Sequence, residues 1–288
     1  MSPFRLAHLS DLHFSKISWG VSQFFSKRWI GNFNFLLRRR KEFDYSLLEE
    51  LLPLFLQEKV QKVLISGDVS CTSLEVEFLK ASLFVETLKK EGIETIILPG
   101  NHDHYTKKET KNKTFHKFFQ KPGSSYTLEK DRLEVIPLNA FWSIVALDTT
   151  LATHLFSCKG EFSKELENTL QEALETLPKN AKIIVANHFP ILLPKEESLQ
   201  REEALVAILK KYPNIKLYLH GHTHKRRITD LRNTGLPVII DSGSASHKFR
   251  GSFNLLDCEE DSCLIRPYTW QKQAWTAEKP VPFTWRTL

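Results

Sequence analysis

The chain has 288 residues, of which 41% are hydrophobic, with a formal net charge of +6 and a pI near 9.0. This length and apolar content suffice for a sizeable core in one large domain, and no Gly/Ser-rich or Pro-rich linker divides the sequence. No window approaches 18 uninterrupted apolar residues, and the first residues lack a long apolar core behind a basic start, so we expect neither a membrane span nor a signal peptide. The four cysteines form no CxxC pair, which favours reduced thiols in a cytoplasmic protein. The basic charge indicates an anionic partner without identifying it.

Short apolar runs alternate with helical stretches along the chain. Runs such as "KVLISGD", "TIILPGNHD" and "KIIVANH" are rich in Val and Ile and end in polar residues, as buried strands do. We predict helices near residues 46–59, 73–90, 163–177 and 198–211. Thr72 and Glu75 are placed as a capping box for the second helix. Because only strand-like runs follow the last helix, the pattern predicts a layered α/β fold with some antiparallel strands.

Candidate metal ligands stand at the end of nearly every strand-like run. They are Asp11, His13, Asp68, Asn101, His102, His188, His222 and His224. The carboxyl ends of strands in an open α/β sheet converge on one crevice, so we expect these side chains to meet there. Imidazole, carboxylate and amide oxygen ligands suit Mn, Fe, Zn or Co rather than Ca. The candidates exceed the needs of one tetrahedral ion, which favours two ions that share a bridging carboxylate.

The ordered set "DLH", "GDVS", "GNHD", "NHFP" and "GHTH" resembles the motifs of the calcineurin-like metallophosphoesterase superfamily. It is most similar to the bacterial branch that includes cyclic-nucleotide phosphodiesterases. The resemblance covers residues 11–224 and implies a layered sandwich of two mixed β-sheets flanked by helices. It implies one metal held by Asp11, His13, Asp68 and His224. It implies a second metal, with Asp68 bridging, held by Asp68, Asn101, His188 and His222.

The resemblance gives His102 a role other than metal binding. Its position implies contact with the phosphate and protonation or stabilisation of the leaving oxygen, and a histidine with a pKa near 6.5 can supply such a proton. Asp103, as a support beside His102, and His104, as a substrate contact, are further candidates. We interpret the remaining histidines as packed or surface side chains: His8, His116, His154, His220 and His247.

A basic, aromatic segment at residues 14–45 looks like an insertion relative to the family. Apolar residues recur at every fourth position, namely Val21, Phe25, Trp29, Phe33 and Leu37, and the run "RRRK" follows them. Such a pattern over residues 17–41 is typical of a peripheral anchor on an anionic membrane surface. It is equally typical of an aromatic stripe packed as a lid or a dimer face. Both interpretations stay open, and the oligomeric state is not predicted.

We expect a phosphoesterase domain over residues 1–265 and a Trp- and Pro-rich tail over residues 266–288. The leading hypothesis is a two-metal hydrolase of phosphodiester or pyrophosphate bonds, in which a bridging hydroxide attacks phosphorus and His102 assists the leaving group. The alternatives are a membrane-surface hydrolase of a lipid-linked pyrophosphate of the UDP-diacylglucosamine type, a nuclease, and a non-catalytic membrane-bound scaffold. Nucleic acid is disfavoured, since its binding surface would spread cations over several elements. We expect a cytoplasmic location, at most peripheral on the inner face of the membrane.

Overall fold

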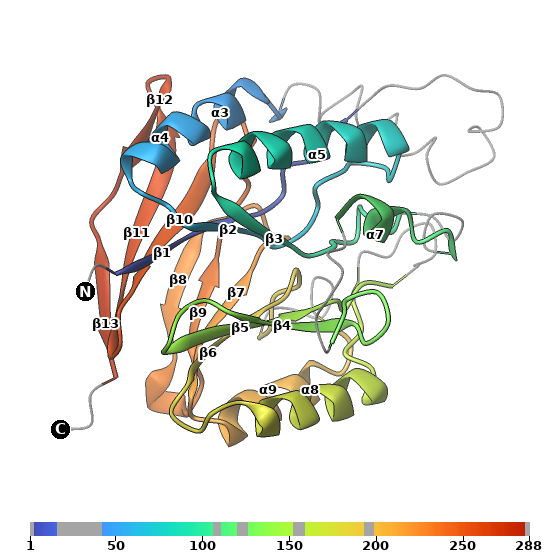
Figure 1. The fold of residues 1–288 in the computed structure, drawn as a ribbon, viewed down its shortest axis with the longest axis vertical. Coiled ribbons are helices and arrows are strands. Elements are labelled where there is room, and N and C mark those ends of the chain that lie inside the picture. Colours follow the sequence, from blue (N-terminus) through green and yellow to red (C-terminus); the bar gives the residue numbers. More distant parts are fainter. Residues whose placement is uncertain are drawn as a thin grey trace.

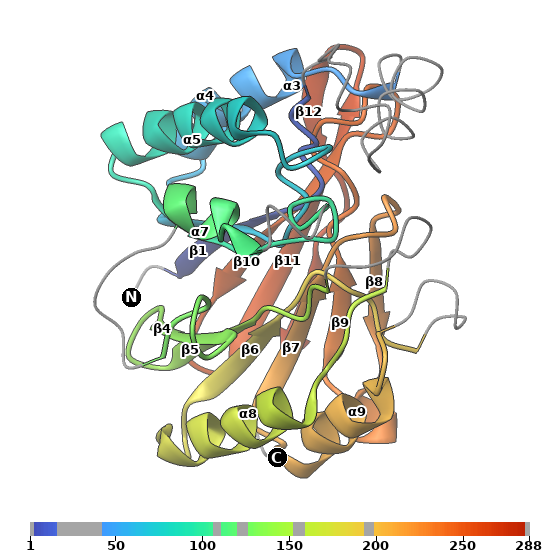
Figure 2. The ribbon, with the colours of Figure 1, turned by 90° about the vertical axis from the view of Figure 1, so that its right-hand side faces the viewer.

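Two mixed β-sheets pack face to face in the computed structural model, and helices cover the outer face of each sheet (Figures 1 and 2). The structure describes residues 3–15, 42–105, 111–119, 126–151, 159–192 and 199–285. This arrangement confirms the predicted α/β sandwich of two mixed sheets flanked by helices. The predicted basic, aromatic stripe at residues 17–41 lies outside the described residues.

The first sheet has seven strands in the described ranges, in the order β12-β11-β10-β1-β2-β3, with β13 paired to β11. Its strands are β1 (Phe4–Leu9), β2 (Lys62–Ile65), β3 (Glu94–Ile97), β10 (Ser252–Cys258), β11 (Ser262–Gln271), β12 (Ala274–Ala277) and β13 (Val281–Thr284). Strands β1, β2 and β3 are parallel, whereas β10 pairs with β1 in the antiparallel sense. The three parallel strands therefore deliver the loops that follow them to the same edge of the sheet.

The second sheet has six strands among the residues that the structure describes, in the order β4-β5-β6-β7-β9-β8. They are β4 (Leu133–Pro137), β5 (Trp142–Leu147), β6 (Lys182–Ala186), β7 (Ile215–His220), β8 (Arg227–Asp230) and β9 (Val238–Asp241). Strands β5, β6, β7 and β9 are parallel, and the edge strands β4 and β8 are antiparallel to their neighbours. The loops after β6 and β7 thus leave the sheet at one end.

Apolar side chains form three layers that hold the sandwich together. The layer between the sheets includes Leu6 and Leu64 from the first sheet and Ile184 and Leu217 from the second. The outer layers lie under α3 (Ser46–Glu49), α4 (Leu51–Gln57) and α5 (Glu75–Lys90) on the first sheet, and under α8 (Lys164–Thr176) and α9 (Glu202–Lys211) on the second. A shorter helix, α7 (Thr114–Phe119), packs beside α5, and a 3-10 turn, η3 (Arg232–Thr234), precedes β9. Strands buried on both faces explain the continuous apolar runs in the sequence.

The predicted capping box of Thr72 and Glu75 is wrong by two residues. Helix α5 begins at Glu75, and the carboxylate of Glu77 accepts hydrogen bonds from the backbone N–H groups of Thr72 (2.8 Å) and Leu74 (3.2 Å). Glu77 is the third residue of the helix, where its side chain can reach back to the exposed N–H groups before the first turn. The predicted helix at 46–59 is divided into α3 and α4.

The C-terminal strands belong to the first sheet. Strand β11 runs across the predicted boundary between residues 265 and 266, and β12 and β13 pair with it. The indole N–H of Trp275 donates a hydrogen bond to the carbonyl of Leu47 (3.0 Å) at α3. None of the helices in the described ranges has the length and hydropathy that a membrane crossing needs.

Candidate metal centre

The predicted ligands lie on loops that follow β1, β2, β3, β6 and β7. These loops carry Asp11 and His13, Asp68, Asn101 and His102, His188, and finally His222 and His224. Asp11, His13 and His188 are completely buried, and Asp68 and Asn101 are nearly so. The structure therefore brings side chains from both sheets into one cluster, as the order of the motifs predicts.

Several of these residues adopt a backbone conformation that non-glycine residues rarely adopt. Asp11, His13, Asp68, His222 and His224 all have positive φ angles, from 48° to 73°. A left-handed conformation of this kind is costly outside glycine and persists only where the surroundings enforce it. Its recurrence at five predicted ligands indicates that the loops are bent to aim these side chains inward.

The first group of ligand atoms comes from Asp11, His13 and His224. The Nε2 atoms of His13 and His224 lie 2.9 Å apart. Oδ1 of Asp11 lies 3.1 Å from Nε2 of His224 and 3.5 Å from Nε2 of His13. The ring of Phe43 packs on His13 with 4.8 Å between ring centroids and shields this side of the cluster.

The second group comes from Asn101, His188 and His222. Oδ1 of Asn101 lies 3.2 Å from Nε2 of His188 and 3.0 Å from Nδ1 of His222. Nδ1 of His188 donates a hydrogen bond to the carbonyl oxygen of Ser66 (2.8 Å), which can only accept. In the neutral ring this bond places the proton on Nδ1, so that the lone pair of Nε2 is directed at the cluster.

Asp68 lies between the two groups. Its Oδ2 atom is 3.8 Å from Nε2 of His13 and 3.6 Å from Nε2 of His188. Burial opposes ionisation of Asp68, but the neighbouring His188 and His102 outweigh it and hold the pKa of the carboxyl well below its usual range. Burial likewise lowers the pKa of His188, and the Asp68 and Asp11 carboxylates overcome this and raise it to about 9. The Asp11 and Asp68 carboxylates therefore supply buried negative charge that attracts a cation, which is the proton of His188 when no metal ion is bound.

Glycines bring the backbone close enough to complete the cluster. A Cβ atom on Gly100 would lie 2.2 Å from Oδ1 of Asp68, and one on Gly67 would lie 2.4 Å from Nδ1 of His188. Gly67 also has a φ of +106°, which side chains disfavour. The glycines of "GD" and "GNHD" are therefore required by lack of space as well as by backbone conformation.

His102 lies at the edge of the cluster and is held at several points. Its backbone N–H donates to Oδ1 of Asp68 (2.8 Å), and its Nδ1 donates to the carbonyl oxygen of Cys71 (2.7 Å). Its ring stacks on Tyr105, with 5.6 Å between centroids, and meets His13 edge-on at 5.1 Å. Because Nδ1 is engaged by a backbone acceptor, Nε2 is the atom that points away from this anchor.

Asp103 connects two of the ligand loops. Its carboxylate accepts hydrogen bonds from the backbone N–H groups of Gly100 (2.9 Å), Val69 (3.1 Å) and Ser70 (2.8 Å), and from the Ser70 hydroxyl (2.8 Å). Burial and the negative charge of Asp68 raise the pKa of Asp103 to about 7. Asp103 thus positions the loops that carry Asp68 and His102.

His104, the predicted substrate contact, is buried beside His116 and Asp148. Its ligand atom groups with those of His116 and Asp148, within 4.8 Å of one another. Among the other histidines, Nε2 of His8 lies 2.9 Å from the Ser66 hydroxyl, and His247 is buried, whereas His154 lies outside the described residues. Asp148 directly follows the apolar run of β5, and no sequence motif links it to a histidine.

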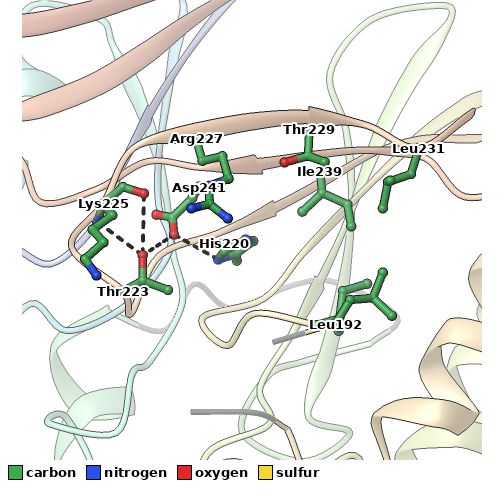
Figure 3. A pocket seen from close by; sticks show the side chains of 10 residues that line it. Leu192, His220, Thr223, Lys225, Arg227, Thr229, Leu231, Ile239 and Asp241 are labelled. Atoms are coloured by element: carbon green, nitrogen blue, oxygen red, sulfur yellow. Dashed lines mark hydrogen bonds and ion pairs between the residues drawn. The ribbon is translucent and has the colours of Figure 1, made fainter. Parts of the chain in front are cut away.

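Thr223 and Asp241 are positioning residues, and the sequence motifs do not reveal their contact. The Thr223 hydroxyl, between the two histidines of "GHTH", donates a hydrogen bond to Asp241 at the end of β9, and Asp241 lies 3.7 Å from Nδ1 of His220 (Figure 3). They line a pocket of about 380 Å³, whose wall also includes Leu192 and Arg227. The only available signal was that "VIID" ends in an acid, and nothing in the sequence pairs β9 with β7.

The donor set fits metal ions. Carboxylates, an amide oxygen and imidazole nitrogens converge, and the Nε2 atoms of His13 and His224 lie 2.9 Å apart. A cation between such atoms would be coordinated by both, and the mixed N and O donors suit Zn, Mn, Fe or Co. Asp11, His13 and His224 form one group within 4.8 Å, and Asp11, Asp68 and His188 form another.

A sandwich with buried carboxylates and imidazoles at its strand ends is the architecture of a metal-dependent hydrolase. The model of the calcineurin-like phosphoesterase family matches residues 4–226, so the chain belongs to this family and is a metallophosphoesterase, a hydrolase of phosphoric ester bonds. Membership implies two metal ions as cofactors, and the two ligand groups agree with that number.

Curated relatives are phosphodiesterases by name. The chain is 25% identical over 232 residues to a probable glycerophosphodiester phosphodiesterase of Arcobacter nitrofigilis, covering 78% of this chain and 77% of that protein. It is 24% identical over 199 residues to a 3',5'-cyclic adenosine monophosphate phosphodiesterase of Vibrio vulnificus, covering 66% of this chain and 58% of that protein. The match thus spans well under two thirds of the length of the cyclic-nucleotide relative.

Solved structures share the fold at low identity. A dimetal phosphatase from Danio rerio superposes with a TM-score of 0.65 at 13% identity, covering 99% of this chain and 100% of that chain. Purple acid phosphatase PPD1 from yellow lupin gives a TM-score of 0.66 at 10% identity, covering 98% of this chain and 54% of that chain. These comparisons agree with the sandwich seen here.

Proposed function

We propose that the protein hydrolyses phosphodiester bonds with two metal ions that share the carboxylate of Asp68. The observation that carries this proposal is the position of Oδ2 of Asp68, 3.8 Å from Nε2 of His13 and 3.6 Å from Nε2 of His188. One carboxylate oxygen is thus within reach of both ligand groups. The names of the curated relatives, a glycerophosphodiester and a cyclic-nucleotide phosphodiesterase, favour a diester as the substrate class.

The ligands divide between two ions. Asp11, His13, Asp68 and His224 would hold one ion. Asp68, Asn101, His188 and His222 would hold the other. When bound, two metal ions neutralise charge on the phosphate oxygens and acidify a water molecule. The protein supplies the fixed geometry, since the tautomer of His188 is set by Ser66 and the backbone of each loop is bent inward.

His102 acts on the leaving group in this proposal. With Nδ1 donating to the carbonyl of Cys71, the proton delivered to the departing oxygen is held at Nε2. The N–H of His102 donates to Asp68, so the position of this acid is tied to the shared carboxylate. Proton donation of this kind contributes about 10²- to 10⁴-fold to the rate when the leaving group is a poor one.

Hydrolysis of bis-p-nitrophenyl phosphate tests the reaction class. We expect the full chain, stripped with a chelator and supplied with Mn²⁺, Zn²⁺, Fe²⁺ or Co²⁺, to release p-nitrophenolate, and Asp68→Ala to lose both activity and bound metal. p-Nitrophenyl phosphate, a monoester, should turn over more slowly. Inactivity toward both esters with all four metals would contradict the proposal, and faster monoester turnover would contradict its substrate class.

The alternative function, hydrolysis of a lipid-linked pyrophosphate, depends on the basic segment at residues 17–41. This segment lies outside the described residues. A substrate panel run with and without anionic vesicles tests it directly. It should contain cyclic nucleotides, glycerophosphodiesters, UDP-linked lipids and single-stranded DNA. We expect the diesters to be the best substrates, and a preference for the lipid pyrophosphate with vesicles present would overturn that expectation.

A further inference from the structure

A second cluster of metal-ligand side chains lies outside the phosphoesterase centre. It consists of His104 on the loop after β3, His116 on α7 and Asp148 immediately after β5. The three ligand atoms lie within 4.8 Å of one another, and the side chains are 7%, 8% and 4% exposed. None of the three is needed for the metal ions assigned to the strand-end loops.

His104 carries a buried atom with no partner. Its Nε2 has no hydrogen-bond partner although it is shielded from solvent. A buried polar atom without a partner costs about 1–3 kcal/mol in general, so native proteins usually supply a partner, a water or an ion. In the described ranges, neither histidine forms a hydrogen bond or an ion pair with Asp148, so the three groups lie close together without satisfying one another.

The surroundings of Asp148 stabilise its ionised form. Its Oδ1 accepts hydrogen bonds from the N–H (2.9 Å) and hydroxyl (2.6 Å) of Thr150 and lies 3.5 Å from the guanidinium of Arg132. Burial opposes the charge, but Arg132 outweighs it and lowers the pKa of Asp148. Burial lowers the pKa of both His104 and His116, which favours neutral imidazoles. The cluster thus offers one carboxylate and two imidazoles in the protonation states that metal ligands require.

We propose that His104, His116 and Asp148 bind a further divalent transition-metal ion, Zn²⁺ in the first instance. Two histidines and one carboxylate form a ligand set that Zn²⁺ accepts with a water in the fourth position. Ligand atoms around such an ion are about 3.4 Å apart, since the bonds are about 2.0–2.1 Å long, so small rotations of the three side chains close the site. The ring of Phe115, 5.5 Å from that of His116 and 6.1 Å from that of His104, provides an apolar wall.

The ion would connect three separate elements. His104 is on the loop that also carries Asn101 and His102, whereas His116 and Asp148 belong to a helix and to a strand end of the other sheet. Binding would therefore stabilise the loop that holds His102 without adding a ligand to the phosphoesterase centre. The role is structural, and it is independent of which ester the enzyme hydrolyses.

Metal counting tests the proposal. The full chain and His116→Gln are stripped with a chelator, equilibrated with Zn²⁺, passed through a desalting column and analysed by inductively coupled plasma mass spectrometry. We expect His116→Gln to retain one equivalent less than the unaltered protein. Lys117→Gln, the exposed neighbour on α7, should retain as much as the unaltered protein. This difference does not depend on how many ions the phosphoesterase centre holds, so it stands apart from the two-metal assignment. Equal zinc contents would overturn the proposal.

A direct measurement covers the case in which His116→Gln does not fold. Crystals of the unaltered protein soaked in ZnCl₂ should give a zinc-edge anomalous peak between the three side chains. The Asp68→Ala protein should keep that peak while losing those of the phosphoesterase centre. No peak between His104, His116 and Asp148 would refute the site.

Discussion

The hydroxyl of Thr223 donates a hydrogen bond to the carboxylate of Asp241, which joins the loop between the two "GHTH" histidines to the end of strand β9. The same hydroxyl accepts a hydrogen bond from the backbone N–H of Lys225 at 3.1 Å. Thr223 therefore fixes the turn from inside, while His222 and His224 extend to the ligand cluster on either side of it. Thr223 thus holds in place the turn that carries two of the proposed ligands.

Replacing Thr223 by Val keeps the shape of the side chain and removes these hydrogen bonds. We expect metal affinity to fall about 10-fold, since groups that hold metal ligands in place are typically worth 10- to 100-fold. Competition with a chromophoric chelator measures the affinity. Thr229→Val, on β8 and lining the same pocket, is the matched control and should bind metal as the unaltered protein does. Equal affinity in both variants would show that Asp241 does not hold the loop.

His102→Ala should separate leaving-group assistance from metal binding. We expect an unchanged metal content and a kcat that falls about 10²- to 10⁴-fold for an alkyl phosphodiester, whose departing alkoxide needs a proton. The loss should be much smaller for bis-p-nitrophenyl phosphate, because p-nitrophenolate leaves readily without one. Steady-state kinetics with both esters provide the comparison. The same fractional loss for both would mean that His102 acts in some way other than proton donation.

Gly100→Ala tests the close approach of two ligand loops. The new Cβ would lie 2.2 Å from Oδ1 and 2.4 Å from the backbone nitrogen of Asp68, so the Asp68 carboxylate must move. We expect a loss of about 1–3 kcal/mol in the free energy of unfolding, as for other overpacked sites, together with loss of bound metal. Chemical denaturation and metal analysis measure the two effects.

Gly235→Ala is the control for this substitution. Gly235 has a φ of +78° and no atom within 4 Å of an added Cβ, so alanine there costs stability through the backbone alone, about 1 kcal/mol. Its metal content and activity should stay unchanged. Retention of metal by Gly100→Ala would show that the loops can move apart without releasing the ions.

Glu58 makes the stability of the first sheet depend on pH. Its carboxylate accepts hydrogen bonds from Arg266 (2.6 Å) and from the hydroxyl of Tyr268 (3.0 Å) on β11. Burial opposes the charge, but these hydrogen bonds outweigh it and lower the pKa of Glu58 below its ordinary value of 4.5. The stabilisation is therefore fully present above about pH 4.5 and is lost as the pH falls through the lowered folded-state pKa.

Glu58→Gln removes this dependence. At pH 7 we expect it to cost about 1–2 kcal/mol of unfolding free energy, as for hydrogen bonds to charged groups. The difference from the unaltered protein should shrink between pH 5 and pH 3. Urea unfolding of metal-free protein across this range measures it, with the exposed Glu203→Gln as control. A difference that stays constant with pH would exclude ionised Glu58 as its source.

The motifs allowed the convergence of the candidate ligands to be predicted because these polar residues follow the ends of the strands. Asp68 and His188 directly follow short apolar runs, so their convergence follows from parallel strands. The contacts of Asp241 and Asp148 could not be predicted in the same way, because they depend on which strands are neighbours. Strand order places β9 beside β7, and tertiary packing brings α7 to the end of β5. The spacing of residues along the sequence indicates neither of these two neighbours.

The predicted capping residue of α5 was wrong because two glutamates lie near the start of the helix. Glu75 and Glu77 both lie near the start of α5, and the sequence alone suggested Glu75 as the capping residue. The helix begins two residues later than predicted, which makes Glu77 the side chain that reaches Thr72. Tertiary contacts decide such boundaries more often than propensity does.

The position of β10 between β1 and β11 has a consequence for the order of assembly during synthesis. Arg5 on β1 pairs with Asp257 on β10, which the ribosome adds 252 residues later. The second sheet, by contrast, comes from one continuous stretch between Leu133 and Asp241. Domains of this size fold through partly formed states, and pairing between distant segments is slow because a long loop must close. We therefore expect the second sheet to form on the nascent chain before β10 is available to pair with β1. Early arrest of translation should then expose the edge of β1 to chaperones.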